Sequence, residues 1–284
     1  MFKSTENELN VISFAIDISN VCNLKCSYCY ANWIYKERKI PSHLKLSKHQ
    51  LLKIIDELKK IKKYKIIIRI LGGEPTLHQL LYFFIDELLK ISQIIKIMIV
   101  SNGTKMVRVY ENPVVEYHFS CHFENNHHNY TSIISNIKAL NRHNIKPVMN
   151  ILMHKDYLND ITKCCDDIKK QNLNCVLYPV YIFDNHDNVN FTQKILPEPR
   201  KYLWNKKLYT FRECYNHSFL NRLCYINIFS IFSNGDVEEY CTGKKYGNLF
   251  KGEIHLDEIN LSFQKCLYNN GLCHDETTIG FIKI

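Results

Sequence analysis

Between residues 13 and 182, short β-branched runs alternate with longer amphipathic segments, and this alternation restricts the possible fold more than any other feature of the chain. The run "KIIIRIL" at 65–71 is apolar at most positions, which is typical of a parallel strand buried on both faces. The segment after Ser47 instead repeats its leucines and isoleucines at helical spacing, and the Ser47 hydroxyl can cap that helix. Further strands are predicted near 13–19, 95–101, 114–123, 147–153 and 175–182, and further helices near 77–91, 131–143 and 158–170.

Repeated strand–helix units predict an α/β fold with a mostly parallel sheet and helices outside it, either open or curled into a barrel. In such folds the functional loops follow the carboxyl ends of the strands. A polar stretch with two prolines at 184–200 ends the repeat, and short aromatic-rich segments follow it. We therefore predict a core over 1–190 and a small α+β extension over 205–284.

Three cysteines lie within eight residues in "VCNLKCSYCY" at 21–30, with three residues in the first gap and two in the second. The loop follows the strand predicted at 13–19, so it lies at a carboxyl end. Tetrahedral zinc takes four ligands and a cubane iron–sulfur cluster has four corners, so Cys22, Cys26 and Cys29 leave one position open. A structural zinc loop with a distant fourth ligand is the alternative.

The motif "CNLKCSYCY" resembles the signature of the radical S-adenosylmethionine (radical SAM) superfamily. The resemblance implies that Cys22, Cys26 and Cys29 hold a [4Fe–4S] cluster, that S-adenosylmethionine chelates the fourth iron, and that Tyr28 lies by its adenine. It also implies a partial (β/α)6 TIM-like barrel. The activity implied is reductive cleavage of S-adenosylmethionine to a deoxyadenosyl radical that abstracts hydrogen from a substrate, with a flavodoxin- or ferredoxin-type protein as electron donor.

A second motif, "LGGEPTLH" at 71–78, follows a predicted buried strand and is similar to the GGE element of that family. Glycines let the backbone approach a ligand closely, and a carboxylate pairs with an ammonium group such as that of the methionine moiety. Alone, the motif would be an ordinary turn before a helix, as would "VSNGT" at 100–104. The resemblance makes candidate cofactor contacts of Gly72, Gly73, Glu74, Pro75, Ser101 and Asn102.

The segment "HFSCHFE" at 118–124 alternates polar and apolar residues with a period of two. A parallel strand buried on both faces would be apolar throughout, so the polar face is predicted to look into the barrel mouth. An edge strand with a solvated face would show the same alternation. On the first interpretation Ser120 and the nearby Asn150 are candidate cofactor contacts, while Glu124 and His122 contact substrate or accept a proton from the substrate radical.

Four cysteines near the end of the chain form a looser group, namely Cys224, Cys241, Cys266 and Cys273. A hairpin turning at "SNGD", 233–236, would bring the first two together. The pattern is similar to the twitch domain, the shortened form of the SPASM extension, which implies a second, auxiliary [4Fe–4S] cluster. Cys214 or His274 could replace Cys266 as a ligand, and core cysteines or a zinc site are the alternatives.

The remaining cysteines, Cys121, Cys164, Cys165, Cys175 and Cys214, follow no ligand spacing and are predicted to pack in the interior. The chain carries a net charge of +9, but its lysines are scattered along helical patterns, so a nucleic-acid partner is not favoured. No apolar run is long enough to span a bilayer, and the N-terminus lacks the pattern of a signal peptide. We expect a cytoplasmic protein without a membrane partner.

The resemblances imply an oxidoreductase or C–H modifying enzyme that acts on a small polar molecule or a peptide. An auxiliary cluster could accept the electron left after hydrogen abstraction, which gives a net two-electron oxidation. A peptide maturase for ribosomally made peptides, forming a crosslink or an epimer, shares the same parts. A metal-binding nucleic-acid module without catalysis is the alternative of a different class, and it requires a clustered basic face.

Overall fold

The computed structural model describes residues 10–124, 128–153, 155–181, 202–204, 207–209, 223–240 and 242–265. Six strands follow one another in a parallel sheet whose order is also their order along the chain. They are β1 (Val11–Asp17), β2 (Lys65–Leu71), β3 (Ile94–Ser101), β4 (Val115–Cys121), β5 (Val148–Met153) and β6 (Val176–Tyr181). Each overlaps a predicted strand, which confirms the α/β class and the parallel arrangement.

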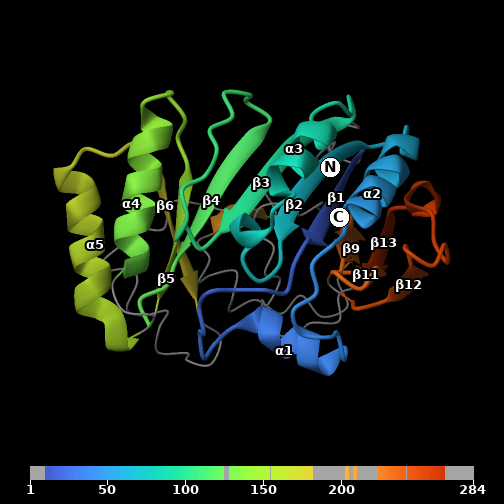
Figure 1. The fold of residues 1–284 in the computed structure, drawn as a ribbon, viewed down its shortest axis with the longest axis horizontal. Helices are drawn as coiled ribbons and strands as arrows, with labels where there is room; N and C mark the ends of the chain where they lie inside the picture. The colour runs from blue at the N-terminus through green and yellow to red at the C-terminus, as the bar shows by residue number, and fades with distance from the viewer. Residues whose placement is uncertain are drawn as a thin grey trace.

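Four helices lie side by side over one face of this sheet in Figure 1, namely α2 (Lys48–Lys60), α3 (Leu81–Leu88), α4 (His128–Asn141) and α5 (Leu158–Lys170). The predicted cap of α2 is confirmed: the Ser47 hydroxyl accepts from the backbone N–H of Gln50, whose side chain accepts from the Ser47 N–H. Helix α1 (Tyr30–Glu37) lies beyond the carboxyl end of β1. The described residues thus form an α/β fold with a parallel-rich sheet of the TIM-like kind, as predicted.

The helix predicted near 77–91 is shorter than expected. Residues Pro75–Leu77 form a separate 3-10 turn, η1, in which the Glu74 side chain accepts from the backbone N–H of Thr76. The ring of His78 then accepts from the N–H of Leu80 and also contacts the carbonyl of Leu46 at 3.0 Å. Because these side-chain contacts replace helical hydrogen bonds, α3 begins only at Leu81.

Strands after residue 223 extend the same sheet beyond β1. Strand β10 (Ile228–Ile231) pairs parallel with β1, and β11 (Asp236–Glu239) and β12 (Lys245–Asn248) follow antiparallel. The predicted turn at 233–236 is confirmed, with Gly235 at a φ of 93° that favours glycine. Two short pairs lie outside this sheet: β9 (Leu223–Ile226) with β13 (Ser262–Lys265), and β7 (Tyr202–Trp204) with β8 (Lys207–Tyr209). A further 3-10 turn, η3 (Leu256–Glu258), follows β12, and η2 (Lys155–Tyr157) precedes α5.

The interior between the sheet and α2–α5 is apolar and contains several of the cysteines. Cys121, Cys164 and Cys165 are buried there and Cys175 is half-buried, as predicted for packing residues. Burial raises the pKa of Cys165 to about 12 and that of Cys175 to about 11, so both remain neutral thiols. Cys214 lies outside the described residues.

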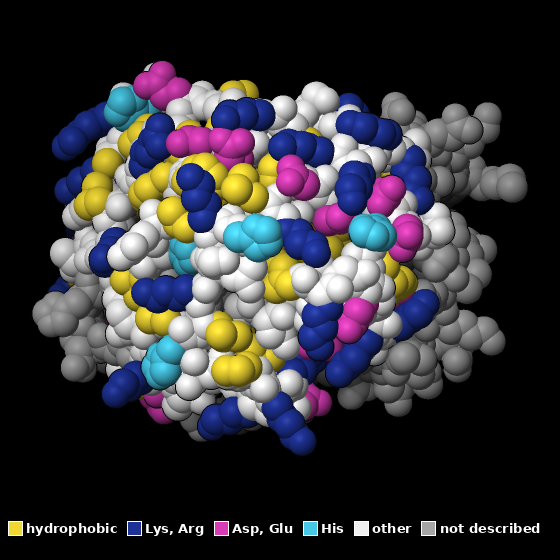
Figure 2. Space-filling model, turned by 45° about the vertical axis from the view of Figure 1, so that its right-hand side comes forward, with side chains coloured by type: hydrophobic (Ala, Val, Ile, Leu, Met, Phe, Trp, Pro, Cys, Tyr) yellow, Lys and Arg dark blue, Asp and Glu magenta, His cyan; other side chains and the backbone are white. Residues whose placement is uncertain are grey.

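The surface in Figure 2 carries lysine and arginine side chains interspersed with acidic, histidine and apolar groups. Several lysines of the described residues pair with an acidic side chain, as Lys60 does with Glu57 and Lys59 with Asp56. This face therefore has no concentrated basic patch of the kind that nucleic-acid binding requires. In the part of the chain that the structure describes, every helix is too short or too polar to cross a membrane.

Candidate active site at the carboxyl ends of the strands

The three clustered cysteines lie on the loop that joins β1 to α1, and all three are free thiols. Backbone hydrogen bonds fix the start of this loop to the GGE motif: Gly73 donates to the carbonyl of Ser19 at 2.6 Å, and Glu74 donates to the carbonyl of Val21 at 2.8 Å. The two motifs are therefore joined directly, although about fifty residues separate them in the chain.

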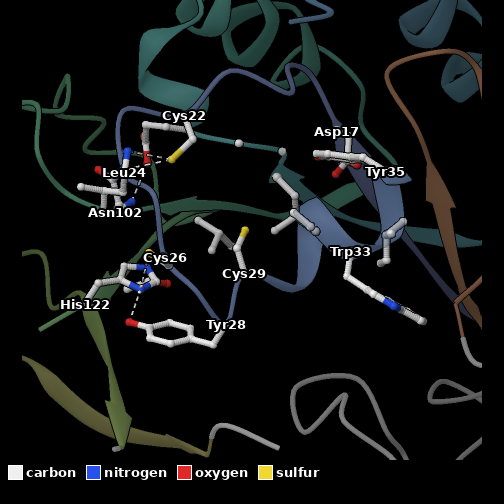
Figure 3. Close-up of a pocket in the computed structure, with 18 of the residues that line it drawn as sticks. Asp17, Cys22, Leu24, Cys26, Tyr28, Cys29, Trp33, Tyr35, Asn102 and His122 are labelled. Atoms are coloured by element: carbon white, nitrogen blue, oxygen red, sulfur yellow. Dashed lines mark hydrogen bonds between the residues drawn. The ribbon is translucent and has the colours of Figure 1, made fainter. Parts of the chain in front are cut away.

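One cavity of about 770 Å³ opens between the cysteine loop and the carboxyl ends of the strands (Figure 3). The cavity brings together eleven residues predicted from the sequence. They are Cys22, Cys26, Cys29, Tyr28, Gly72, Gly73, Glu74, Ser101, Asn102, Ser120 and His122. The polar face of "HFSCHFE" thus reaches the barrel mouth through Ser120 and His122, as predicted.

The two glycines of the GGE motif are required by the close approach of the cysteine loop. A Cβ at Gly73 would lie 2.4 Å from the carbonyl oxygen of Val21, and one at Gly72 would lie 2.2 Å from that of Ser19. Gly72 also has a φ of 132°, which side-chain-bearing residues rarely adopt. Any larger residue would push the cysteine loop away from this strand end.

Glu74 is buried, with 1% of its surface exposed, and its carboxylate is held by donors from two motifs. Its Oε1 accepts from the Thr76 hydroxyl at 2.5 Å and from the Ser101 hydroxyl at 2.8 Å. Its Oε2 accepts from the backbone N–H of Asn102 at 2.6 Å. Oε1 accepts most of these hydrogen bonds, so Oε2 can still accept one more from the cavity side.

Asn102 links the third strand to the first cysteine. Its side-chain amide donates to the Asn23 side chain at 2.9 Å and lies 3.8 Å from the Cys22 sulfur. The backbone N–H of Leu24 lies 3.4 Å from the same sulfur. Asn102 was a candidate cofactor contact by resemblance, which stays a prediction, and the structure adds its contact with Cys22.

Tyr28 and His122 pack face to face with ring centroids 6.0 Å apart, and the Tyr28 hydroxyl lies 3.2 Å from His122 Nδ1. The Cys26 sulfur lies 3.5 Å from that same nitrogen. Burial lowers the pKa of His122 to about 4, so the ring is neutral at pH 7 and Nδ1 can accept from the Tyr28 hydroxyl. Proton transfer by His122 stays a prediction.

Glu124 also contacts the cysteine loop. Its Oε2 accepts from the backbone N–H of Ser27 at 2.8 Å, and Glu124 does not line the cavity. This geometry gives Glu124 a role in positioning the loop, while the predicted proton transfer remains untested. Pro75 and Asn150 also lie outside the lining: Pro75 begins η1, and Asn150 is paired with Ser120 across β4 and β5.

The cysteines of the C-terminal group are described only in part. Cys224 belongs to β9 and pairs with Gln264 of β13, two residues before Cys266 in the chain. Cys241, Cys266 and Cys273 lie outside the described residues, as do Cys214 and His274. Tyr240, which precedes Cys241, lines the same cavity as the cysteine loop. The role of the four C-terminal cysteines as cluster ligands therefore stays a prediction.

The cavity also contains functional candidates that the sequence reasoning missed, above all Asp17 and Tyr35. Asp17 is the last residue of β1, and the Tyr35 hydroxyl donates to its Oδ2 at 3.0 Å. Burial raises the pKa of Asp17 to about 7, and the Tyr35 hydrogen bond offsets that rise only in part. The available signal was an acidic residue that ends an otherwise apolar strand, "VISFAID".

The donor set fits an iron–sulfur cluster better than a single metal ion. Within the described ranges, no three His, Cys, Asp or Glu side chains converge closely enough to hold one ion. Zinc binding requires ligand atoms at about 2.0–2.3 Å from one centre. A cubane cluster instead bonds each thiolate to a different iron, so three free thiols spread along one cavity wall can serve it.

Comparison with known proteins places the chain in a family. Residues 16–190 match the radical SAM superfamily, and the chain belongs to it. Members of this superfamily are enzymes that use a [4Fe–4S] cluster and S-adenosylmethionine. This confirms the family, the enzyme class and the first pair of cofactors expected from the two motifs.

Two curated relatives are similar over limited stretches. A GTP 3',8-cyclase of Pasteurella multocida is 30% identical over 93 residues, which are 33% of this chain and 26% of that protein. The radical SAM cyclopropyl synthase TigE of Paramaledivibacter caminithermalis is 28% identical over 151 residues, 43% of this chain and 30% of that protein. The matches thus span less than a third of each relative.

Two solved structures share the fold over most of the chain. A structure of anSMEcpe with bound AdoMet has a TM-score of 0.59 at 15% identity, covering 88% of this chain and 78% of that one. Streptococcus suis SuiB bound to S-adenosylmethionine has a TM-score of 0.51 at 16% identity, covering 84% and 63%. At these identities the likeness establishes the fold alone.

Proposed function

We propose that this radical SAM enzyme abstracts hydrogen from a small polar molecule or a peptide and completes a net two-electron oxidation through an auxiliary cluster. Cys22, Cys26 and Cys29 would hold the first cluster. The observation that carries this proposal is the direct backbone pairing of the cysteine loop with Gly73 and Glu74 beside one cavity. Cluster and S-adenosylmethionine, when bound, supply the radical chemistry.

The residues around Glu74 suit the methionine end of S-adenosylmethionine. The free side of Glu74 Oε2 would accept from the methionine ammonium, and Ser101 and Asn102 would keep the carboxylate in place. Gly72 and Gly73 permit the close approach, and Pro75 begins the turn behind them. Tyr28 would lie by the adenine, with Ser120 on the cavity wall and Asn150 beside it as further contacts.

An auxiliary [4Fe–4S] cluster on Cys224, Cys241, Cys266 and Cys273 forms the second part of the proposal. It is supported by the β10–β11 hairpin, which delivers Tyr240, the neighbour of Cys241, to the cavity that contains the first three cysteines. A cluster near this end of the cavity would lie close enough to receive the electron left after hydrogen abstraction. A flavodoxin- or ferredoxin-type protein would reduce the first cluster.

A peptide substrate is the alternative favoured by a specific comparison. The fold is similar to that of anSMEcpe with bound AdoMet and the Cp18Cys peptide, at a TM-score of 0.57 and 14% identity. A maturase that crosslinks or epimerises a peptide would use the same cavity. His122 and Glu124 are proposed to contact the substrate or accept its proton, in addition to the contacts they make with the cysteine loop.

Iron counting on anaerobically reconstituted protein tests this proposal. We expect about eight irons per chain and formation of deoxyadenosine from S-adenosylmethionine with a reductant. Cys22→Ala, Cys26→Ala or Cys29→Ala should each remove about four irons and all cleavage, while Cys241→Ala should remove about four irons and leave cleavage measurable. Cys175→Ala is the matched control, since that half-buried cysteine follows no ligand spacing.

Two outcomes would contradict the proposal at different points. Zinc as the sole metal in anaerobically purified protein would refute the first site. Unchanged iron content in Cys241→Ala would refute the auxiliary cluster and leave the first site intact. A loss of iron in Cys175→Ala equal to that in Cys22→Ala would mean that iron content reports stability and not ligation.

A further inference from the structure

Asp17 is half-buried at the wall of the cavity and has few polar partners. In the described part of the chain the Tyr35 hydroxyl is the one group that donates to it, and this bond goes to Oδ2. Oδ1 receives no hydrogen bond from the described residues. Glu74, at the end of the next strand, accepts four hydrogen bonds in comparison.

The surroundings of Asp17 are mostly apolar. Leu71 is its neighbour in register on β2, and Phe232 follows the end of β10 on the other side. Val100, Leu152 and Val180 of other strands line the same cavity. The Tyr35 hydroxyl occupies Oδ2, and Oδ1 is open to the cavity, where a hydrogen-bond donor of a ligand can reach it.

We propose that Asp17 and Tyr35 form a substrate subsite that binds an amine or hydroxyl group carried on an apolar or aromatic body. The subsite rests on the proposed function, because it lies in the cavity that contains the cysteine loop. Oδ1 of Asp17 accepts the hydrogen bond from the substrate, and Tyr35 holds the carboxyl group through Oδ2. The apolar wall then contacts the rest of the molecule.

The position of the pair separates it from the cofactor residues. In Figure 3 Asp17 and Tyr35 lie across the cavity from Tyr28 and His122, with Cys29 between the two pairs. Glu74 belongs to the GGE motif and has donors from Ser101, Asn102 and Thr76. The methionine ammonium and a substrate amine would therefore each have a separate carboxylate.

The raised pKa of Asp17 suits this role. At pH 7 the group is near its midpoint, so it accepts from a hydroxyl in either form and becomes fully charged beside an ammonium. The Tyr35 phenol on α1 contacts it, and the titratable groups that line the same cavity are Cys22, Cys26, Cys29, Tyr28, Glu74, His122 and Tyr240. Among the described residues no cation neutralises Asp17, so a cationic group of a ligand can take that role.

Binding of 2-phenylethylamine and of its ether analogue, methyl 2-phenylethyl ether, tests the subsite. The amine carries an ammonium on an aromatic body, whereas the ether has the same body and no donor. Equilibrium dialysis with reconstituted protein should show that Asp17→Asn weakens amine binding at least about tenfold and leaves ether binding within about twofold. Asp56→Asn removes the same charge from the exposed face of α2 and should change neither.

Equal amine binding by the parent protein and Asp17→Asn would overturn the subsite. Failure of the parent protein to bind the amine saturably up to about 10 mM would also overturn it. Cleavage of S-adenosylmethionine by the parent protein is measured separately and tests the proposed function. Selective amine binding without any cleavage would retain the subsite and refute the function.

Discussion

Replacing Asp17 by asparagine should stabilise the protein at neutral pH, because the side chain keeps its shape but loses its ionisable group. Asparagine Oδ1 can still accept from the Tyr35 hydroxyl. Burial raises the pKa of Asp17 from 3.8 to about 7, which corresponds to about 4 kcal/mol of lost free energy of unfolding once the group is ionised. Because Asp17 is only half-buried and faces the cavity, we discount this for solvent screening and expect about 2 kcal/mol.

The direction follows from the protons bound in each state. Between about pH 4 and pH 7 the native protein holds a proton on Asp17 that the unfolded chain has released. The free energy of unfolding of the parent protein therefore falls as pH rises through this window and levels off above it. Asp17→Asn lacks this contribution, so the difference between the variant and the parent should grow with pH.

Anaerobic urea unfolding followed by circular dichroism measures this difference. Between pH 5 and pH 8 the stability of Asp17→Asn relative to the parent should increase by about 1–3 kcal/mol. Asp56→Asn, on the exposed surface of α2, should show no such pH-dependent gain. A constant difference across this range would show that Asp17 is ionised at ordinary cost, and the argument from burial would be wrong.

Three further changes test the contacts around the cysteine loop. Gly73→Ala places a Cβ 2.4 Å from the Val21 carbonyl oxygen, so it should displace the loop and remove most of the iron of the first site, measured per chain. Glu74→Gln replaces one carboxylate oxygen by an NH2 group, which cannot accept from the Asn102 N–H or the Ser101 hydroxyl. We expect this variant to bind S-adenosylmethionine at least about tenfold more weakly in equilibrium dialysis. Glu124→Gln keeps an acceptor for the Ser27 N–H and should retain the parent iron content, whereas Glu124→Ala should lower it; equal loss in both variants would exclude the positioning role.

The strands and most helices could be predicted because their signals are local. An apolar run such as 65–71 has few alternatives to a buried strand, and Ser47 with Gln50 marks a helix start. The pairing of β10 with β1 could not be predicted, since it joins residues more than two hundred positions apart. The late start of α3, after the separate 3-10 turn at Pro75–Leu77, depends on side-chain contacts that the hydrophobic periodicity does not reveal.

The site was predictable to the extent that its residues belong to motifs. The cysteines and the GGE element were found because their spacing expresses a chemical requirement, and "HFSCHFE" because polar residues on a buried strand need an explanation. The contact between Glu124 and Ser27 joins residues 97 positions apart, so no pattern in the chain announces it. Asp17 escaped attention because one acidic residue at a strand end is common.

Glu74 and Asp17 follow or end neighbouring strands but differ in the number of hydrogen bonds that the protein donates to them. Glu74 accepts hydrogen bonds from the Thr76 and Ser101 hydroxyls and from the backbone N–H of Asn102, so the protein holds both of its carboxylate oxygens. Asp17 receives one bond from Tyr35, and burial favours its neutral form. A carboxylate fixed by several donors suits a cofactor that needs one defined position, while a carboxyl group with a pKa near 7 and one open oxygen suits a ligand that arrives and leaves. Because both side chains line one cavity, we expect cofactor and substrate to occupy adjacent places in it, each with its own carboxyl group.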